Sequence, residues 1–408
     1  MWYLLISSIV LFSISTIKYR AVCSINNIFT FMWTCTLVLN CLLANDLGVI
    51  EPSDDVFFYV TIAVIVFNVT YLMLINREEN KIHYNFNDEI IISNKYIFLC
   101  ISVVLLMPII IENVAVIMSG NLGLIRTLYV ERISTAGGVY VYLTMIIPFS
   151  IINCAMIISA IEVVYKKTYR YFFLTLFSMI AYTLAYGGRD HLKTMFIYLL
   201  VLMAFSDKKR FNKKIIFYVF LLVGVIVGIT YSRGLEDKSF LEMVASYFLY
   251  QYSMLEYIIE NPYSYGLNDS NSYGMLLLGP VATLPSMLLK IIFPEVNIPA
   301  NEIGVYTQPF INIGTGDNFV LTNAHVTSIY YFLFDCGTSG VLLGPFIFSL
   351  LVCVIQKIKM KSKNIMWDYI SLFLIVAVIN SPIAYELCQP YVALMFPIMW
   401  LMMRKARK

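Results

Sequence analysis

The chain has 408 residues, of which 60% are hydrophobic and 13% are charged, and its mean hydropathy is +0.78. So few charges exclude a soluble globular domain and indicate a polytopic membrane protein. The net charge of +3 is small, and no basic patch interleaved with aromatic residues argues for nucleic-acid binding.

Apolar runs long enough to cross a bilayer recur along the whole chain. Barrel strands are about 10 residues long and alternate, so runs of this length favour membrane-spanning helices. The first run has no basic n-region and no small-residue cleavage site, so we expect a span and not a removable signal. The pattern predicts an all-α polytopic membrane protein with about eleven transmembrane helices. They are expected at about Met1–Ile17, Ile25–Ala44, Val56–Ile75, Tyr96–Ile117, Val139–Val164, Tyr171–Tyr186, Leu192–Phe205, Ile215–Tyr231, Thr338–Ile355, Met366–Ala384 and Tyr391–Met403.

Lys and Arg residues are divided unequally between alternate loops. One set of loops carries 21 of the 28, and the other set carries seven. Because loops rich in basic residues stay in the cytoplasm, the first set is expected inside. The amino terminus is then periplasmic and the carboxyl terminus cytoplasmic. The chain divides into residues 1–232 with eight helices and short loops, 233–337 as one large periplasmic loop, and 338–408 with three helices and a basic cytoplasmic tail.

An amphipathic helix is expected near the start of the large loop. Ser239 and Glu242 match a capping box, and apolar residues recur at helical spacing from Leu241 to Ile259. Ser253 and Glu256 fall away from this stripe. We therefore expect a helix that lies on the outer membrane-facing surface or caps the bundle, with these polar side chains turned away from the apolar stripe.

The apolar run Met275–Phe293 is long enough to span, and the sequence leaves open whether it does. Gly279, Pro280 and Pro285 interrupt helical hydrogen bonding within it. A span here would also place the acidic stretch 294–318, which has no basic residue, in the cytoplasm, against the charge bias. We therefore favour a re-entrant or surface-lying hairpin, which is tolerated where protein or water lines it.

Four arginines are expected on the outer face, namely Arg126, Arg132, Arg189 and Arg233. A guanidinium group offers a permanent charge and paired donors that match phosphate oxygens, so these residues are candidates for binding a phosphate-bearing ligand. A helix start at Asp190 would offer backbone N–H groups to the same anion, and His191 is a weaker candidate beside it. The alternative is contact with lipid headgroups or pairing with nearby acidic residues.

Polar residues gather at the end of the large loop. His325 could take a proton from a sugar hydroxyl, or it could hold a phosphate or a backbone carbonyl. Asp335 follows ten residues later, about three helical turns away, and could orient a neighbour or sit in a solvated turn. Asp317 could bind sugar hydroxyls or serve as a base, and Asn323 is a further candidate for substrate binding.

Several kinds of site are absent from the sequence. The eight cysteines are scattered in mostly apolar runs without a CxxC pair, so neither a disulfide framework nor a zinc site is indicated. No Walker loop, dinucleotide fingerprint, GxSxG or DxD-type metal motif occurs. We expect no metal and no cofactor, so the energy for a reaction must come with the substrate.

Three stretches carry a resemblance to a known family: YGGRDH around Arg189, YSRG around Arg233, and TNAHVTSIYYFLFDCGTSG. Together with the many spans and the large late loop, they resemble the bacterial O-antigen polymerases of the Wzy type, the oligosaccharide repeat-unit polymerases. The last stretch resembles the family's Asn-Ala…Asp-Xaa-Gly-Xaa-Xaa-Gly signature. The matching residues are Asn323, Ala324, Asp335, Gly337 and Gly340, and Cys336 replaces the aromatic residue often found after the Asp.

The resemblance implies a GT-C-like bundle and a metal-independent glycosyltransferase of the bacterial inner membrane. Its substrates would be undecaprenyl-pyrophosphate-linked oligosaccharides, and a chain-length regulator and a flippase would be its partners. Arg189 and Arg233, helped by Arg126 and Arg132, would neutralise the leaving pyrophosphate. His325 would activate the acceptor hydroxyl, with Asp335 orienting it.

Two other functions remain open at this point. An O-antigen ligase shares the layout but transfers the finished glycan to lipid A core. A flippase for the lipid-linked sugar also needs cationic groups, but these should line a cavity between spans. The phenotype of a deletion strain separates the three.

Overall fold

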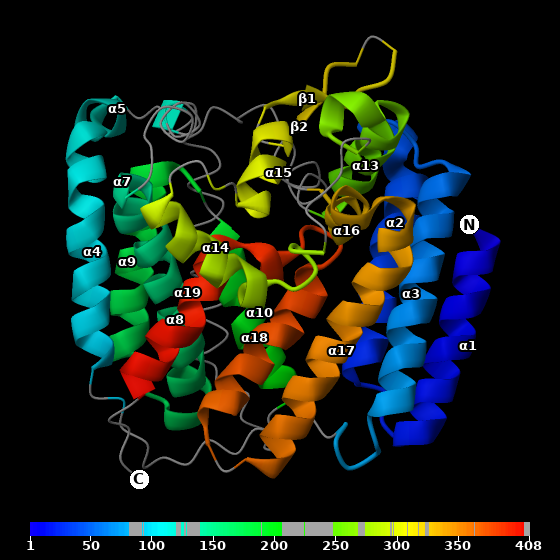
Figure 1. The fold of residues 1–408 in the computed structure, drawn as a ribbon, viewed down its shortest axis with the longest axis horizontal. Helices are drawn as coiled ribbons and strands as arrows, with labels where there is room; N and C mark the ends of the chain where they lie inside the picture. The colour runs from blue at the N-terminus through cyan, green and yellow to red at the C-terminus, as the bar shows by residue number, and fades with distance from the viewer. Residues whose placement is uncertain are drawn as a thin grey trace.

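The computed structural model describes residues 1–80, 92, 94–119, 124–125, 128, 139–188, 190–205, 224, 248–267, 274–293, 296, 298–307, 309–316, 318–322, 326–362 and 364–403. This part of the chain is mostly helical, with one short β-hairpin (Figure 1). The long helices run side by side, and short helices and the hairpin cover one end of the bundle, the upper end in Figure 1.

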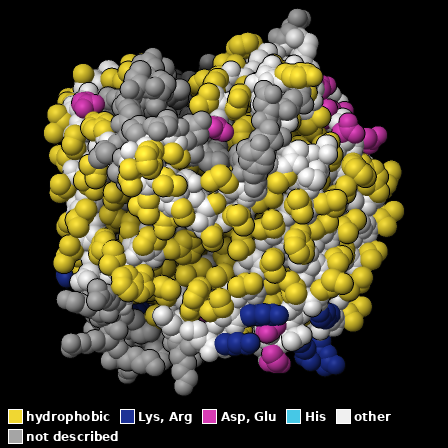
Figure 2. Space-filling view, viewed as in Figure 1, with side chains coloured by type: hydrophobic (Ala, Val, Ile, Leu, Met, Phe, Trp, Pro, Cys, Tyr) yellow, Lys and Arg dark blue, Asp and Glu magenta, His cyan; other side chains and the backbone are white. Residues whose placement is uncertain are grey.

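Six segments of the described chain are long and apolar enough to cross a bilayer. Four are single helices, α1 (Trp2–Tyr19), α2 (Ile25–Leu47), α3 (Asp54–Leu74) and α4 (Lys95–Glu112). The fifth runs through η1 (Tyr142–Ile146), α8 (Ile147–Ile161) and η2 (Glu162–Lys166), and the sixth through α16 (Ser328–Cys336), η4 (Gly337–Ser339) and α17 (Gly340–Lys361). The visible surface of the bundle is largely apolar (Figure 2). This fold agrees with the all-α membrane protein that the sequence predicts.

Shorter helices occupy the other expected spans that the structure describes. They are α9 (Arg170–Tyr186), α10 (Asp190–Phe205), α18 (Met366–Asn380) and α19 (Pro390–Met403). These helices have 17, 16, 15 and 14 residues. At 1.5 Å per residue they are about 21 to 26 Å long, less than the roughly 30 Å of a hydrocarbon core. The expected span Ile215–Tyr231 lies outside the described residues, so the expected number of crossings stays a prediction.

The remaining elements are short, and most of those labelled in Figure 1 lie toward its upper end, with α14 nearer the middle. They are α5 (Val114–Met118), α7 (Val139–Val141), α13 (Tyr250–Glu260), η3 (Pro262–Tyr265), α14 (Pro280–Ile292), α15 (Pro299–Thr307), β1 (Ile311–Asn312), β2 (Leu321–Thr322) and η5 (Glu386–Cys388). β1 and β2 pair antiparallel, with Ile311 opposite Thr322. The hairpin is joined to the α2–α3 turn, because the Ile50 N–H donates to the Ile313 carbonyl over 2.9 Å.

Aromatic side chains form the core between α2, α3 and α17. The rings of Phe29 and Phe67 stack with centroids 3.9 Å apart, and Phe348 meets Phe67 edge-on at 5.6 Å. The Ser349 hydroxyl donates to the Phe67 carbonyl oxygen over 2.9 Å. The small serine allows α17 to pack closely on α3 while its hydroxyl remains hydrogen-bonded.

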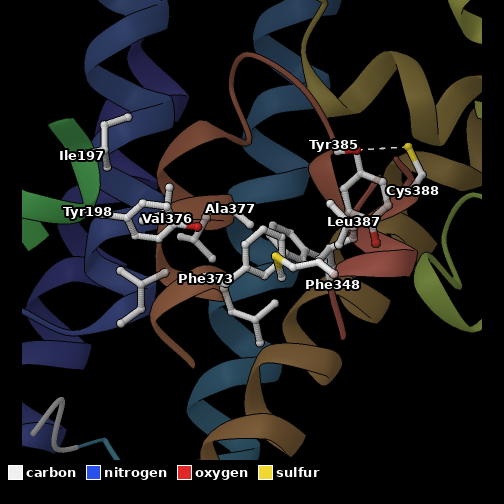
Figure 3. Packing of buried hydrophobic residues seen from close by; sticks show 14 of the residues in the cluster. Ile197, Tyr198, Phe348, Phe373, Val376, Ala377, Tyr385, Leu387 and Cys388 are labelled. Carbon is white, nitrogen blue, oxygen red and sulfur yellow. Dashed lines mark hydrogen bonds between the residues drawn. The ribbon is translucent and has the colours of Figure 1, made fainter. Parts of the chain in front are cut away.

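A second part of the core lies between α10, α17, α18 and the α18–α19 linker (residues 381–389). Figure 3 shows Tyr198 of α10 beside Val376 and Ala377 of α18. Phe348 of α17 packs edge-on against Tyr385 of the linker, with ring centroids 5.6 Å apart. The linker is therefore part of the buried core and not a solvated loop.

Basic side chains mark one end of the bundle. Apart from Lys193 and Lys290, the described Lys and Arg residues lie where α1, α3, η2 and α17 end and where α4 and α9 begin. Figure 2 shows such side chains along its lower edge. At this end Lys95 and Glu162 form a buried ion pair, and the Lys95 ammonium also lies 4.7 Å from the centre of the Tyr171 ring.

The helix α13 differs from the expectation for this stretch. Ser253 and Glu256 were expected to turn away from the packed face, but they are 0% and 5% exposed. Asn40 of α2 donates to the Ser253 hydroxyl over 3.3 Å, and the Ser53 N–H donates to the Glu256 carboxylate over 2.7 Å. The helix is thus enclosed on both faces, because α2 and the start of α3 supply polar partners. The expected capping box at Ser239 lies outside the described residues.

The apolar run 275–293 does not form one straight span. Turns occupy residues 274–279, and α14 has 13 residues, which gives a length of about 20 Å. Val281, Leu288 and Ile292 are exposed on one of its faces. We call residues 274–293 the turn–helix segment, and its expected placement as a re-entrant or surface-lying hairpin stays a prediction.

Candidate functional site

Asp335 lies at the end of α16 and is 3% exposed. Its Oδ1 accepts a hydrogen bond from the Gly274 N–H over 3.1 Å, and its Oδ2 accepts one from the Leu277 N–H over 2.9 Å. Free N–H groups in a turn that opens a helix bind carboxylates well. The carboxylate therefore holds the start of the turn–helix segment in place.

The glycines that follow Asp335 are required by the backbone. Gly337 has φ 59°, a conformation that side chains with a Cβ rarely adopt. A Cβ atom at Gly340 would clash with the Phe332 carbonyl oxygen, because α16 folds back onto α17 at this point. The Asp-Xaa-Gly-Xaa-Xaa-Gly pattern thus builds a tight helix junction that presents Asp335.

The turn–helix segment packs on the α18–α19 linker. The Tyr385 hydroxyl donates to the Leu277 carbonyl oxygen over 3.1 Å, and the Thr283 hydroxyl donates to the Cys388 carbonyl oxygen over 3.2 Å. A Cβ atom at Gly279 would lie only 3.0 Å from the Leu387 carbonyl oxygen, so this contact also needs a glycine. The large loop and the last two helices therefore meet at the linker.

Glu386 is the charged residue of this linker, and the sequence analysis did not single it out. Its Oε1 accepts a hydrogen bond of 2.6 Å from the Asn380 side-chain amide. Burial raises the pKa of Glu386 to about 7, while the charge of Lys193 and the bond from Asn380 oppose this rise. The signal was an acidic residue between two apolar helices in SPIAYELCQP, on the side where the sequence places the large loop.

The start of α10 lies near enough to this carboxylate for its charges to act on it. Asp190 adds a negative charge that contributes to the raised pKa of Glu386. The Lys193 ammonium lies 3.9 Å from the Asp190 carboxylate, and their side chains are 14% and 48% exposed, respectively. The structure therefore brings the predicted residue Asp190 together with Glu386, with Asp190 on the open side. We call Asp190, Lys193, Tyr198, Asn380 and Glu386 the linker cluster.

Tyr198 and Asn380 of the linker cluster each have a buried polar atom without a hydrogen-bond partner among the described residues. These atoms are the Tyr198 hydroxyl and the Asn380 Oδ1, in side chains that are 0% and 1% exposed. A buried polar group left unsatisfied costs about 1–3 kcal/mol. The Tyr198 side chain is near enough to Glu386 to interact with its charge.

His191 has partners of a different kind. It is 1% exposed, and its Nε2 lies 2.8 Å from the Met179 carbonyl oxygen and 3.1 Å from the Thr183 hydroxyl. Its ring meets the Tyr182 ring edge-on. These contacts hold the α9–α10 turn together, so the structure gives His191 a packing role beside the linker cluster.

The other predicted site residues lie outside the described residues. They are Arg126, Arg132, Arg189, Arg233, Asp317, Asn323 and His325. In the chain, Arg189 stands between Gly188 and Asp190, both of which are described. The roles assigned to these seven residues stay predictions.

The arrangement offers a partly buried carboxyl group, a neighbouring cation and unsatisfied polar atoms at one end of the bundle. Among the described residues, no group of three His, Cys, Asp or Glu side chains is placed to hold a metal ion. Comparisons with protein-family models, curated proteins and solved structures found no match to this chain.

Proposed function

We propose that this chain is a membrane glycosyltransferase that polymerises undecaprenyl-pyrophosphate-linked oligosaccharide repeat units into O-antigen polysaccharide. One observation carries the proposal: the α18–α19 linker brings together two of the stretches that resemble the polymerases. The linker binds the turn–helix segment held by Asp335, and its Glu386 lies near enough to Asp190 of the YGGRDH stretch to interact with its charge. These stretches are about 140 residues apart in the sequence and adjoin one linker in the fold.

The charge distribution supports the orientation that this activity needs. Loops rich in Lys and Arg remain in the cytoplasm, and the described basic residues other than Lys193 and Lys290 mark the end of the bundle opposite the linker cluster. We infer that the linker cluster and the large loop face the periplasm of a bacterial inner membrane. The amino terminus is then periplasmic and the carboxyl terminus cytoplasmic, with about eleven crossings.

The proposed reaction moves the growing glycan from its lipid pyrophosphate to the acceptor sugar of a fresh lipid-linked repeat unit. An acceptor hydroxyl attacks the anomeric carbon, the anomeric C–O bond to the pyrophosphate breaks, and the lipid pyrophosphate leaves with the bonding electrons. Arg189 and Arg233, helped by Arg126 and Arg132, neutralise the charge on the leaving group. Guanidinium groups supply the stabilisation that a metal ion supplies elsewhere.

Asp335 has a supporting part in this proposal. Its two backbone hydrogen bonds fix the turn–helix segment against the linker, so its removal would displace one wall of the site. A base must also take the proton of the attacking hydroxyl. The sequence offers His325 for this step, and Asp317 and Asn323 remain candidates for binding sugar hydroxyls.

A deletion strain tests the function. Gel analysis of its lipopolysaccharide should show core that carries a single repeat unit, without chains of two or more repeats. The wild-type gene should restore the ladder of longer chains. Loss of every repeat from the core would favour a ligase. Failure to display the single repeat at the outer side would favour a flippase, and an unchanged ladder would refute all three roles.

A further inference from the structure

We propose that Glu386 is the base that takes the proton from the attacking sugar hydroxyl, and that Asn380 and Tyr198 bind the sugar that carries this hydroxyl. This inference rests on the proposed glycosyltransferase function and names a residue that the family resemblance does not supply. It assigns the proton transfer to the α18–α19 linker instead of His325.

The first argument is the way the carboxyl group is held. Asn380 donates to Oε1 over 2.6 Å from the last residue of α18, so the carboxyl group has a fixed orientation. Among the described residues, a hydrogen bond is made to Oε1 of Glu386 and none to its Oε2, so Oε2 can accept a hydrogen bond from a ligand. A base must lie within hydrogen-bond reach of the proton that it accepts, and a fixed carboxylate oxygen meets this need.

Two unsatisfied atoms also support this role: the Oδ1 of the Asn380 amide that binds the carboxyl group, and the hydroxyl of Tyr198, a side chain near enough to interact with the charge of Glu386. The Asn380 Oδ1 accepts hydrogen bonds, and the Tyr198 hydroxyl both donates and accepts them. A sugar presents neighbouring hydroxyl groups that are also donors and acceptors. The hydroxyl groups of a sugar bound at the carboxyl group can therefore hydrogen-bond to both atoms. Buried polar atoms ordinarily have such a partner.

The third argument is the charge around the site. Among the residues that the structure describes, the titratable groups that interact with Glu386 are Asp190 and Lys193 at the start of α10, Tyr198 further along α10, Tyr331 of α16 and Tyr391 of α19. Lys193 is the one cation among them. Burial raises the pKa of Glu386 to about 7, so the group exchanges protons near neutral pH, as an efficient base should.

The proton balance is simple. As the hydroxyl oxygen bonds to the anomeric carbon, its proton passes to the ionised Glu386 carboxylate. The electrons of the broken C–O bond leave with the lipid pyrophosphate. The protonated Glu386 then returns its proton to water through the side where Asp190 is half-exposed, and the site is ready for the next repeat unit.

The test measures polymerisation by purified chain in lipid nanodiscs. The substrate is the undecaprenyl-pyrophosphate-linked repeat unit extracted from a deletion strain, and initial rates are recorded from pH 5 to pH 9. The variants are Glu386→Gln, Glu386→Asp and His325→Gln. Glu256→Gln serves as the control, because Glu256 is also buried but binds the Ser53 N–H beside α2.

The wild-type polymerisation rate should rise with pH and level off above about pH 7, which gives the pH–rate profile an acid limb. Glu256→Gln should keep this limb. Glu386→Gln should lose about 100-fold or more of the rate at saturating substrate and lose the limb, as expected when a general base is removed. Glu386→Asp should keep a slower reaction with a shifted limb, and His325→Gln should keep the limb.

Three results would overturn the assignment. They are a Glu386→Gln rate within threefold of wild type, a limb that persists in Glu386→Gln, and a limb that vanishes in His325→Gln instead. If Glu386→Gln does not fold, the acid limbs of the pH–rate profiles of the wild type, Glu386→Asp and His325→Gln show whether Glu386 or His325 is the base. Absence of polymer from the wild-type chain would refute the proposed function itself, whereas an active wild type with an unaffected Glu386→Gln refutes only the role of Glu386.

Discussion

At the scale of single residues, Glu386 gives the protein a pH-dependent stability. Burial raises its pKa from 4.5 to about 7. Between these values the folded chain binds more protons at this site than the unfolded chain, so the free energy of unfolding falls as the pH rises. Above pH 7 the full penalty of the buried charge is present, and below pH 4.5 it is gone.

Glu386→Gln should therefore stabilise the protein at alkaline pH. The side chain keeps its shape and its acceptor for Asn380 but carries no charge. We expect the unfolding temperature in detergent to rise by about 2 °C or more at pH 8.5, and to match wild type at pH 4.5. Scanning fluorimetry at the two pH values measures this. Equal unfolding temperatures at pH 8.5 would show that the carboxyl group is not buried as described.

The proposed arginine roles depend on guanidinium geometry and not on charge alone. Arg189→Lys and Arg233→Lys keep the positive charge but lose the paired donors that match phosphate oxygens. Each variant should shorten the glycan ladder strongly in a complemented deletion strain, with a rate loss of about 10-fold or more. Protein abundance measured by immunoblot should stay at the wild-type level. A full-length ladder from both variants would remove the pyrophosphate-binding assignment.

The sequence indicated which side chains are chemically important, but it did not indicate which groups they contact in the fold. The pattern around Asp335 indicated an important carboxylate, yet its partners are backbone N–H groups at 274 and 277, about sixty residues earlier. Glu386 was missed for a similar reason. Its surroundings come from α10, nearly 200 residues away, and no local pattern reports such a contact.

At the scale of elements, the α16–α17 junction places the site. Gly340→Ala should disturb it, because the added methyl group would clash with the Phe332 carbonyl oxygen. We expect a several-fold fall in the amount of protein in the membrane and a matching loss of polymer, the usual effect of forcing atoms into a packed interior. Ser339→Ala, one position earlier, is the control and should accumulate normally. Normal accumulation of Gly340→Ala would show that the junction is looser than described.

Helices were easier to predict than their surroundings. The periodicity around residues 248–260 correctly indicated a helix, but Ser253 and Glu256 are buried and not turned outward. The polar partners that permit their burial belong to α2 and the α2–α3 turn. For residues 275–293, Gly279 and Pro280 correctly indicated where the helix begins, but Pro285 lies inside α14 and does not interrupt it.

At the scale of the whole molecule, the charge bias predicts which end faces the cytoplasm. In a variant without its own cysteines, a single cysteine at Phe319, which is 73% exposed near the β-hairpin, should react with a membrane-impermeant maleimide in intact spheroplasts. A cysteine at Lys361, at the end of α17, should react only after the membrane is permeabilised. The reverse pattern would place the linker cluster in the cytoplasm and refute the proposed activity.

Composition and apolar periodicity were sufficient to predict the class of fold and the positions of most helices. They did not establish the number of crossings, because α9, α10, α18 and α19 are shorter than a full hydrocarbon core. Nor did they predict that the linker would join the bundle to the large loop. That contact depends on packing between segments far apart in the chain.

The most direct test of the central claim is reconstitution. Purified chain in liposomes is given the undecaprenyl-pyrophosphate-linked repeat unit, with EDTA present to remove divalent metal ions. We predict a ladder of lipid-linked products with two or more repeat units, unaffected by EDTA. The gene used to make the protein should also restore polymer in the deletion strain, which confirms that it encodes an active chain. If the substrate then remains as single repeats in the liposomes, the result contradicts the account.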